Sequence, residues 1–352
     1  MFFKTFGFAT LVSLVALAAV GVFAGPQLLL VAAILAVLEV SLSFDNAVVN
    51  ATVLQRMSPY WQKIFLTIGV LIAVFGMRLI FPVLVVAATT GLNLPAVVSL
   101  ALNSPTDYAS ALVSAHPAIA AFGGAFLLLI FLDFMFEEKD LKWLSPLESL
   151  LEKIGKTDAM SVVVTLVALA ISSALVPSHS LQVLLAGVLG VVAYLVVNGL
   201  ASLFESEGDD EDDELAGISG PAKAAQGAKA VIGKAAFFLF LYLEVLDASF
   251  SFDGVIGAFA VTNNVVIIAT GLGVGALFIR SLTVFLVKKG TLAEYVFLEH
   301  GAHYAIGALA VLLMVSIGVE VPDLVTGLTG VFFIGLALVS SIVRNKRATE
   351  VK

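Results

Sequence analysis

Ten long apolar stretches dominate this sequence of 352 residues. Each approaches the roughly 20 apolar residues that a helix needs to cross a bilayer. Continuous apolar runs favour membrane helices, because the strands of a membrane barrel are short and alternate in polarity. The chain is therefore predicted to be an all-α polytopic membrane protein, with spans at residues 6–23, 28–51, 64–86, 118–136, 161–176, 181–203, 235–260, 265–287, 303–317 and 324–343.

The composition narrows the possible functions. Hydrophobic residues make up 60% of the chain and charged residues 12%, and the mean hydropathy is +1.09. The ten spans leave no room for a large soluble catalytic domain, so we expect neither an enzyme nor a resident cofactor. The absence of cysteine excludes disulfides, thiolate metal sites and cysteine nucleophiles. A net charge of −8 argues against a nucleic acid partner.

The basic residues predict the orientation of the spans. Sixteen of the 18 Lys and Arg residues fall in segments on one side of the membrane, and the other two, Arg78 and Arg280, lie inside spans. Cytoplasmic loops carry the excess of basic residues in membrane proteins. We therefore expect a multi-pass protein of the bacterial inner membrane with both termini in the cytoplasm.

The first span permits two interpretations. Lys4, the apolar segment after it and the small residues Ala24 and Gly25 also fit a cleaved signal peptide, which would leave nine spans. We expect the span to be retained, because the internal repeat described next requires a partner for the sixth span.

The two halves of the chain share four markers in the same order. Ser-Phe-Asp-Asn at residues 43–46 recurs as Ser-Phe-Asp-Gly at 251–254, and Leu-Glu-Val precedes each copy, at 38–40 and 243–245. A glycine stands nine residues before an arginine in the next span of each half. Further along, a histidine stands 17 residues before an acid. These last two markers are Gly69 with Arg78, Gly271 with Arg280, His116 with Asp133, and His303 with Glu320.

This offset of five spans predicts an inverted repeat, since an odd offset makes the two copies cross the membrane in opposite directions. Such repeats belong mainly to secondary transporters, which bind their substrate at the repeat interface near the midplane. The predicted organisation is a first five-helix repeat (1–176), the first helix of the second repeat (177–203), an acidic flexible cytoplasmic linker (204–234), the remaining four helices (235–343) and a basic tail (344–352). A short amphipathic helix is expected on the inner membrane face within residues 137–158.

Seven charged residues lie well inside the spans, away from their ends. Each costs about 2.5 to 3.5 kcal/mol at the centre of a membrane helix, so each needs a partner. Arg78 and Arg280 are expected to balance charge. The five acids exceed them by three, and this excess calls for a cation, protons or both. The acids are Glu39, Asp45, Glu244, Asp247 and Asp253.

The acids are candidate ligands of a divalent cation. Glu39 and Asp45 are six residues apart, and a straight helix cannot direct both into one cavity. We therefore predict broken helices, near Ser41 and Ser43 in one copy and near residues 248–251 and Gly254 in the other. Carboxylates beside freed carbonyls form a hard oxygen site that suits Mn²⁺, Mg²⁺ or Ca²⁺. Structural ion pairing is the alternative. The predicted metal ligands are Glu39, Asp45, Asn46, Glu244, Asp247 and Asp253.

Four other polar residues are candidates for a gate or a proton relay. His116 and His303 begin the fourth and ninth spans, and Asp133 and Glu320 lie near the ends of those spans. The alternative for the histidines is an interfacial side chain at a helix end, and for the acids contact with interfacial water.

The segment Leu-Glu-Val-Ser-Leu-Ser-Phe-Asp-Asn-Ala at residues 38–47, with its second copy, resembles the hallmark of the TerC family of bacterial integral membrane proteins. The resemblance covers residues 28–343. It implies an association with tellurite resistance, likeness to inverted-repeat cation exporters and Mn²⁺ efflux by intramembrane acids. Two departures mark a divergent branch: Gly254 replaces the second Asn, and the second Glu and Asp stand three residues further apart, with Asp247 between them.

The leading functional hypothesis is a secondary exporter that moves a divalent cation, most favourably Mn²⁺, by alternating access with proton coupling. The alternative is a membrane scaffold or sensor in metal or tellurite stress that does not itself transport. A third, an intramembrane hydrolase using Asp45 and Asp253, is disfavoured because nearby arginines and additional acids would disturb the shared proton of such a dyad.

Overall fold

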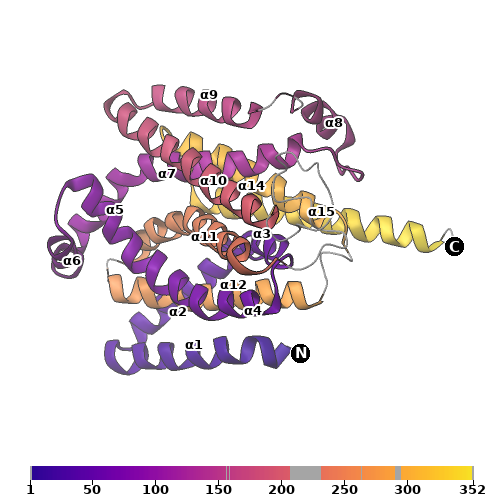
Figure 1. Cartoon of the computed structure of the whole chain (residues 1–352). Helices are drawn as coiled ribbons and strands as arrows, with labels where there is room; N and C mark the ends of the chain where they lie inside the picture. Colours follow the sequence, from indigo (N-terminus) through magenta and orange to yellow (C-terminus); the bar gives the residue numbers. More distant parts are fainter. Residues whose placement is uncertain are drawn as a thin grey trace.

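The computed structural model describes residues 2–155, 157, 159–206, 231–262, 264–289 and 295–350, apart from the side chains of residues 2–4, 201–206, 252, 253, 260, 289, 323, 324 and 348–350. It is a bundle of helices (Figure 1). Its elements are α1 (Phe2–Ala24), α2 (Pro26–Leu42), α3 (Phe44–Leu54), α4 (Pro59–Ile64), η1 (Phe65–Gly69), η2 (Ile72–Ile80), α5 (Phe81–Thr90), α6 (Leu94–Asn103), α7 (Pro105–Phe136), α8 (Ser145–Ile154), α9 (Met160–Ala174), η3 (Pro177–His179), α10 (Ser180–Ser206), α11 (Gly233–Val261), α12 (Val265–Lys289), α14 (Leu298–Ser316) and α15 (Asp323–Glu350).

The structure confirms an all-α polytopic membrane protein. Within the described residues, eight helices are long and apolar enough to cross a bilayer, or nine if the bent pair α2 and α3 is one span. The remaining expected span corresponds to α9, which has only 15 residues. At about 1.5 Å per residue, α9 is shorter than the hydrocarbon core of a typical bilayer.

The third span departs from a regular α-helix. It runs from Pro59 to Thr90 and contains two π-helical segments, η1 and η2. The guanidinium of Arg78 donates a hydrogen bond of 2.5 Å to the carbonyl of Ala73 within η2. Wider π-helical turns are often found where a helix carries a functional residue, and here they carry the first of the two buried arginines.

The core is built around α7, which packs against α14, α10 and α11. Its middle is almost entirely buried because Gly123 and Gly124 allow close approach to Ser249 of α11 and Leu313 of α14. On the other side of the bundle α2 packs against α12, and α1 covers both, with Phe6 against Phe278 and Phe285.

Some helix contacts agree with the expected repeat and others do not. α3 contacts α14 and α11 contacts α7, as equivalent pairs in the two halves should. The first helices of the halves differ, because α1 packs on α12 whereas α10 packs on α7. The inverted repeat and the retention of the first span therefore stay predictions.

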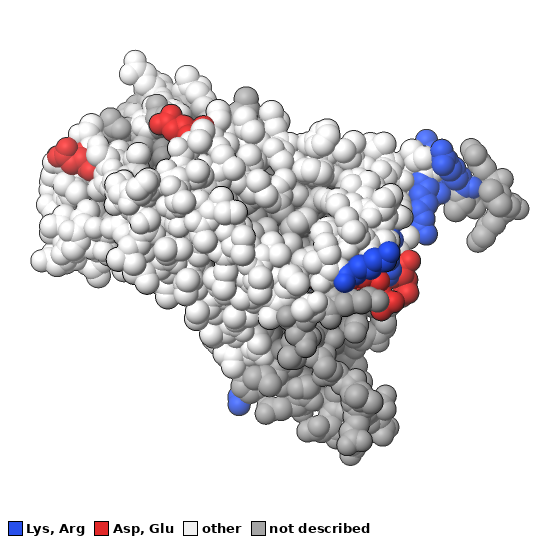
Figure 2. Space-filling model, turned by 90° about the horizontal axis from the view of Figure 1, so that it is seen from above, with Lys and Arg blue, Asp and Glu red and all other residues white. Residues whose placement is uncertain are grey.

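Both chain ends lie at the same end of the bundle, with α8 beside them (Figure 1). We refer to this as the terminal end and to the other, where α6 lies, as the opposite end. Figure 2 shows basic side chains at the terminal end and a broad uncharged band over the middle of the face drawn. This band is the surface expected to contact lipid. The cytoplasmic location of the terminal end stays a prediction.

The structure describes all or part of three segments that connect the predicted spans. The expected amphipathic helix is present as α8. Residues 89–115, between the third and fourth predicted spans, contain α6 and the first turns of α7. Asn93 caps α6 by accepting a hydrogen bond of 2.9 Å from the Ala96 amide. Most of the predicted acidic linker lies outside the described residues. Val231, near its end, pairs with Arg56 and Ser58 of the α3–α4 turn through backbone hydrogen bonds.

Candidate functional site

A break in the second span places the central acids. α2 ends at Leu42 and α3 begins at Phe44, and the two helices are bent by 52° about Ser43. This confirms the predicted break at Ser43, whereas Ser41 remains helical and donates a hydrogen bond to the carbonyl of Val37. Asp45 lies in the first turn of α3, where the helix dipole favours a negative charge.

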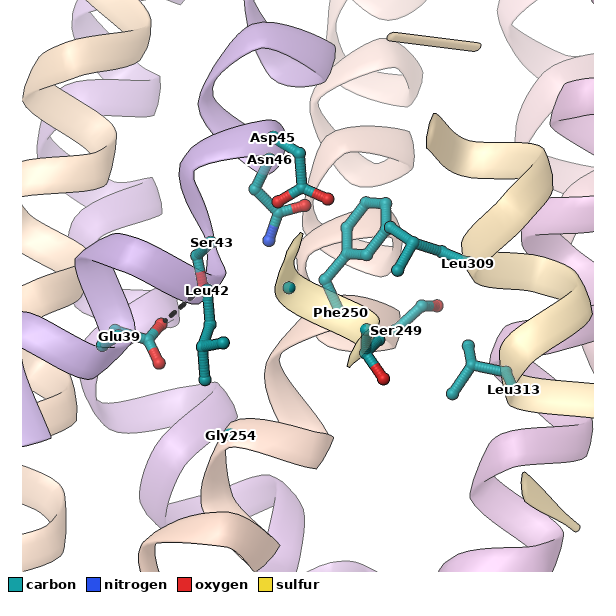
Figure 3. A pocket seen from close by; sticks show the side chains of 12 residues that line it. Glu39, Leu42, Ser43, Asp45, Asn46, Ser249, Phe250, Gly254, Leu309 and Leu313 are labelled. Atoms are coloured by element: carbon teal, nitrogen blue, oxygen red, sulfur yellow. Dashed lines mark hydrogen bonds between the residues drawn. The ribbon is translucent and has the colours of Figure 1, made fainter. Parts of the chain in front are cut away.

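The break opens onto a cavity of about 40 Å³ (Figure 3). Asp45 and Asn46 reach it from α3, Glu39 and Ser43 from the end of α2, and Ser249 from α11. Phe250, Leu309 and Leu313 contribute apolar side chains to its lining. About 10 to 15 Å³ is enough for one water molecule, so this space suits a partly hydrated ion. We call it the acidic cavity.

Glu39 is neutralised by a buried arginine. Arg78 of η2 forms a salt bridge with its Oε1 atom, and both side chains are almost completely buried. The Ser43 hydroxyl donates a hydrogen bond of 3.2 Å to the same carboxylate. A β-carbon on Gly275 of α12 would lie 2.5 Å from the Glu39 side chain, so glycine is required for this close approach. The pair is rigidly packed at one wall of the cavity.

Asp45 has no such partner. Its carboxylate is buried, at 3% exposure, and forms no ion pair within the described part of the chain. It lies against the backbone of α15, where a β-carbon on Gly330 would come within 2.2 Å of its Oδ2 atom. A buried carboxylate without a counter-charge is costly, and a cation or a proton in the acidic cavity would remove that cost.

Further buried polar atoms of α3 and α11 have no hydrogen-bond partner among the described residues. They are Oδ1 of Asn46, both amide atoms of Asn50, and Oγ of Ser251. Asn46 and Asn50 are four residues apart and so share one face of α3. Buried polar atoms are normally hydrogen-bonded, and an exception calls for an explanation. Asn46 lines the acidic cavity, so its amide oxygen is accessible there to a hydrogen-bond donor or a cation.

The second group of acids forms a separate network. Arg280 of α12 makes two hydrogen bonds to Glu244, of 2.9 and 3.1 Å, and a third of 3.1 Å to Asp247. Its guanidinium also lies over the ring of Phe65, 4.0 Å from the centroid. A β-carbon on Gly69 would stand 2.7 Å from Arg280 Nη1, so this glycine makes room for the network. One negative charge remains on these three groups.

The geometry changes the alignment of the two copies. Without a gap, Leu-Glu-Val-Ser-Leu-Ser-Phe-Asp at residues 38–45 matches Leu-Asp-Ala-Ser-Phe-Ser-Phe-Asp at 246–253. Asp247, and not Glu244, then corresponds to Glu39, and the spacing to the next aspartate is the same. Glu39 and Asp247 each pair with the arginine of the following span. In this alignment the spacing is equal in both copies and Glu244 is the additional acid, and Arg280 pairs with Glu244 as well as with Asp247.

The six predicted metal ligands thus do not form one cluster. Glu39, Asp45 and Asn46 share the acidic cavity, and Glu244 and Asp247 are bound to Arg280. The side chain of Asp253 lies outside the described residues. Within the described part of the chain, no three His, Asp or Glu side chains are grouped as a metal site. Both arginines balance charge as expected.

The second predicted break is wrong. α11 is one continuous helix from Gly233 to Val261 and includes residues 248–251 and Gly254. The Ser249 hydroxyl donates to the Val245 carbonyl, so the serine is accommodated without unwinding. Gly254 instead allows close approach, because a β-carbon there would be 3.1 Å from Glu39 Oε2.

The four candidates for a gate or proton relay lie at two ends of the bundle. His116 is inside α7, 11 residues after it begins, and not at a helix start as expected. Glu320 is exposed in the α14–α15 turn. At the terminal end, Asp133 accepts a hydrogen bond of 2.5 Å from the Tyr194 hydroxyl. His303 stacks on Phe134 with ring centroids 3.7 Å apart.

Several residues of the site were not predicted from the sequence. Thr326, Gly327 and Gly330 of α15 border the acidic cavity or Asp45. Small residues in an apolar span are a weak signal, because they also permit ordinary helix packing. Asn50 carried a clearer signal, as a polar residue one turn after Asn46 on an apolar helix.

The fold and the buried charges define a multi-pass membrane protein with an intramembrane polar site. Residues 44–348 match the family described as protein of unknown function (DUF475), and the chain belongs to this family. That description assigns no activity. No curated protein and no solved structure matches the chain.

Proposed function

We propose that this protein is a secondary transporter that moves a divalent cation across the membrane by alternating access. The observation that carries this proposal is the Asp45 carboxylate, which is buried at a helix break, faces the acidic cavity and forms no ion pair with any described residue. Broken helices at the centre of a span are a common device of transporters for exposing polar groups to a substrate within the bilayer.

The chemistry of the cavity supports a hard cation. Its polar groups are the carboxylates of Asp45 and Glu39, the Asn46 amide, and the hydroxyls of Ser43 and Ser249. Oxygen donors of this kind suit Mn²⁺, Mg²⁺ or Ca²⁺. We favour Mn²⁺, and we favour export as the direction, on the resemblance to the TerC family. The scaffold or sensor hypothesis has no structural observation of its own in its favour.

Proton coupling is part of the same proposal. When the cation leaves, Asp45 would remain as an uncompensated charge in a water-poor site, and uptake of a proton would remove it. Glu39 is paired with Arg78 and does not need this exchange. One proton would therefore replace part of the charge of each departing cation.

The proposal is tested by flux through purified protein in liposomes that contain a dye sensitive to Mn²⁺. We expect flux in the wild type that depends on the pH gradient, and a loss of at least tenfold in Asp45→Asn, which keeps the shape and removes the charge. Ser41→Ala is the matched control, since Ser41 is exposed on α2 outside the cavity. Absence of flux of Mn²⁺, Mg²⁺ or Ca²⁺ in folded wild type would refute the proposal. Flux that ignores the pH gradient would refute proton coupling alone.

A further inference from the structure

A second cavity of about 40 Å³ lies directly beside the acidic cavity. Its polar lining consists of His116 from α7, Ser316 from the end of α14 and Thr326 from the start of α15. Leu313 and Thr326 line both cavities. The two spaces are therefore neighbours separated at these two side chains. We call the second space the outer cavity.

The outer cavity lies toward the opposite end of the bundle. Ser316 is the last residue of α14, and Thr326 is three residues into α15, so both flank the α14–α15 turn. Val321, within that turn, also lines the cavity. α15 runs from this turn to the C-terminus at the terminal end (Figure 1). The polar lining thus continues from the acidic cavity away from both termini.

Toward the terminal end the site is closed by packing. The residues of α3 that follow Asn46 are all buried, from Ala47 to Leu54. Most of the apolar ones belong to the main hydrophobic core, together with Phe126 of α7 and Leu246 of α11. A densely packed core leaves no space for an ion. The conformation is therefore closed on the terminal side of Asp45.

We infer that the outer cavity is the vestibule through which the cation passes between the acidic cavity and the opposite face of the membrane, with Leu313 and Thr326 as the gate. This inference rests on the proposed function. The vestibule would accept a partly hydrated divalent cation, since the space exceeds the about 10 to 15 Å³ needed by one water molecule and carries an imidazole and two hydroxyls. Rotation of the Leu313 side chain would join the two spaces.

The chain contains no cysteine, so single cysteines can be introduced into the otherwise unmodified protein. Three positions on α15 make a matched set. Thr326→Cys lies at the gate, Leu328→Cys lies two residues further on the exposed apolar surface, and Lys346→Cys marks the terminal end. Each variant is reconstituted, and a charged, membrane-impermeant methanethiosulfonate is added to one side at a time.

We expect Thr326→Cys to react only from the side opposite to Lys346→Cys, and Leu328→Cys to react from neither side because lipid covers it. Mn²⁺ should slow the reaction at Thr326→Cys at least fivefold. Attachment of the reagent should reduce Mn²⁺ flux at least tenfold, and a thiol reductant should restore it. This reversal shows that the variant is folded.

Reaction of Thr326→Cys from the terminal side, or no reaction from either side in a variant that transports Mn²⁺, would overturn the inference. So would full flux after attachment. The labelling pattern is read independently of transport. The wild type could show no Mn²⁺ flux while Thr326→Cys is still labelled from one side only. That result would refute the proposed function, and the outer cavity would then be a water-accessible pocket without a transport role. If Mn²⁺ flux is intact but Thr326→Cys reacts from the terminal side or from neither side, only the route through the outer cavity is refuted.

Discussion

The carboxylate of Asp45 rests against the backbone of Gly330, so closely that a β-carbon at residue 330 would stand 2.2 Å from Oδ2 and 2.7 Å from the Asp45 β-carbon. Real β-carbons do not approach other atoms to this distance. The contact fixes the acid of α3 to the first half of α15, and it makes the position of Asp45 depend on a helix far away in the sequence.

Gly330→Ala should therefore move Asp45 and impair transport. Overpacking of a close contact costs about 1 to 3 kcal/mol, and the displaced carboxylate would leave its place in the acidic cavity. We expect at least a tenfold loss of Mn²⁺ flux in liposomes. Gly335→Ala on the same helix is the control, since nothing lies within 4 Å of the added carbon, and it should transport like the wild type. Equal flux in both variants would contradict this role of Gly330.

We expect the ion pairs of Arg280 with Glu244 and Asp247 to stabilise the folded protein. Arg280→Met leaves Glu244 and Asp247 buried without a counter-charge, and breaking a buried ion pair in this way costs about 3 to 5 kcal/mol. The midpoint of thermal denaturation in detergent should fall sharply. Adding Glu244→Gln and Asp247→Asn to that variant removes both unpaired charges and should recover most of the loss. A triple variant no more stable than Arg280→Met would show that the charges are not the cause.

Asn50 offers a test in which stability and activity move in opposite directions. Its side chain is fully buried in α3, and neither amide atom has a hydrogen-bond partner in the part of the chain that the structure describes. Replacement by the similarly sized leucine should raise the free energy of unfolding by about 1 to 3 kcal/mol. If the amide serves the cation when the terminal side opens, Mn²⁺ flux should nevertheless fall.

The control for Asn50→Leu is Asn103→Leu, at an exposed position of α6 where the amide already bonds Ser99. It should change neither the denaturation midpoint nor the flux. A fall in stability for Asn50→Leu would indicate that Asn50 is satisfied in the membrane and would remove the argument for its role.

Glu148 predicts a pH dependence at the terminal end. Burial raises the pKa of this carboxyl, but the nearby His300 and the Leu144 backbone amide outweigh it and lower the pKa from 4.5 to about 2. A lowered pKa in the folded state contributes stability that is complete above the unfolded value and is lost as the pH falls toward 2. The docking of α8 should therefore loosen between about pH 4.5 and pH 2.

Trp143 reports this change, because its backbone amide donates to Glu148 and its ring contacts Tyr304. The chain has only two tryptophans, so Trp61→Phe isolates its fluorescence. We expect a red shift of emission over that pH range. Glu148→Gln should show the red shift already at neutral pH, with little further change in acid. A pH response preserved in Glu148→Gln would assign it to another group.

The fold was predicted well from the sequence, because a bilayer is the only environment in which such long apolar stretches are stable. The break at Ser43 was predictable as well, since Glu39 and Asp45 could not reach one cavity from a straight helix. The continuous path of α11 was not, because Ser249 satisfies its hydroxyl within the helix and Gly254 serves close packing. Serine and glycine occur both at helix breaks and within continuous helices, so these residues alone do not predict which of the two forms.

The site was harder to predict than the fold. Sequence spacing placed five acids in one region but could not say which would be neutralised by arginine. Only the salt bridges from Arg78 of η2 to α2, and from Arg280 of α12 to α11, distinguish the paired acids from Asp45. The contribution of α15 depends on a contact between residues nearly 300 positions apart, for which spacing gives no signal.

Asp45 is proposed to hold a divalent cation, and Mn²⁺ binding to the purified protein tests this without any need for transport. Binding is followed by the loss of the electron paramagnetic resonance signal of free Mn²⁺. We predict one Mn²⁺ bound per wild-type chain and at least tenfold weaker binding in Asp45→Asn. Equal binding in both proteins would contradict the account and place any cation site elsewhere.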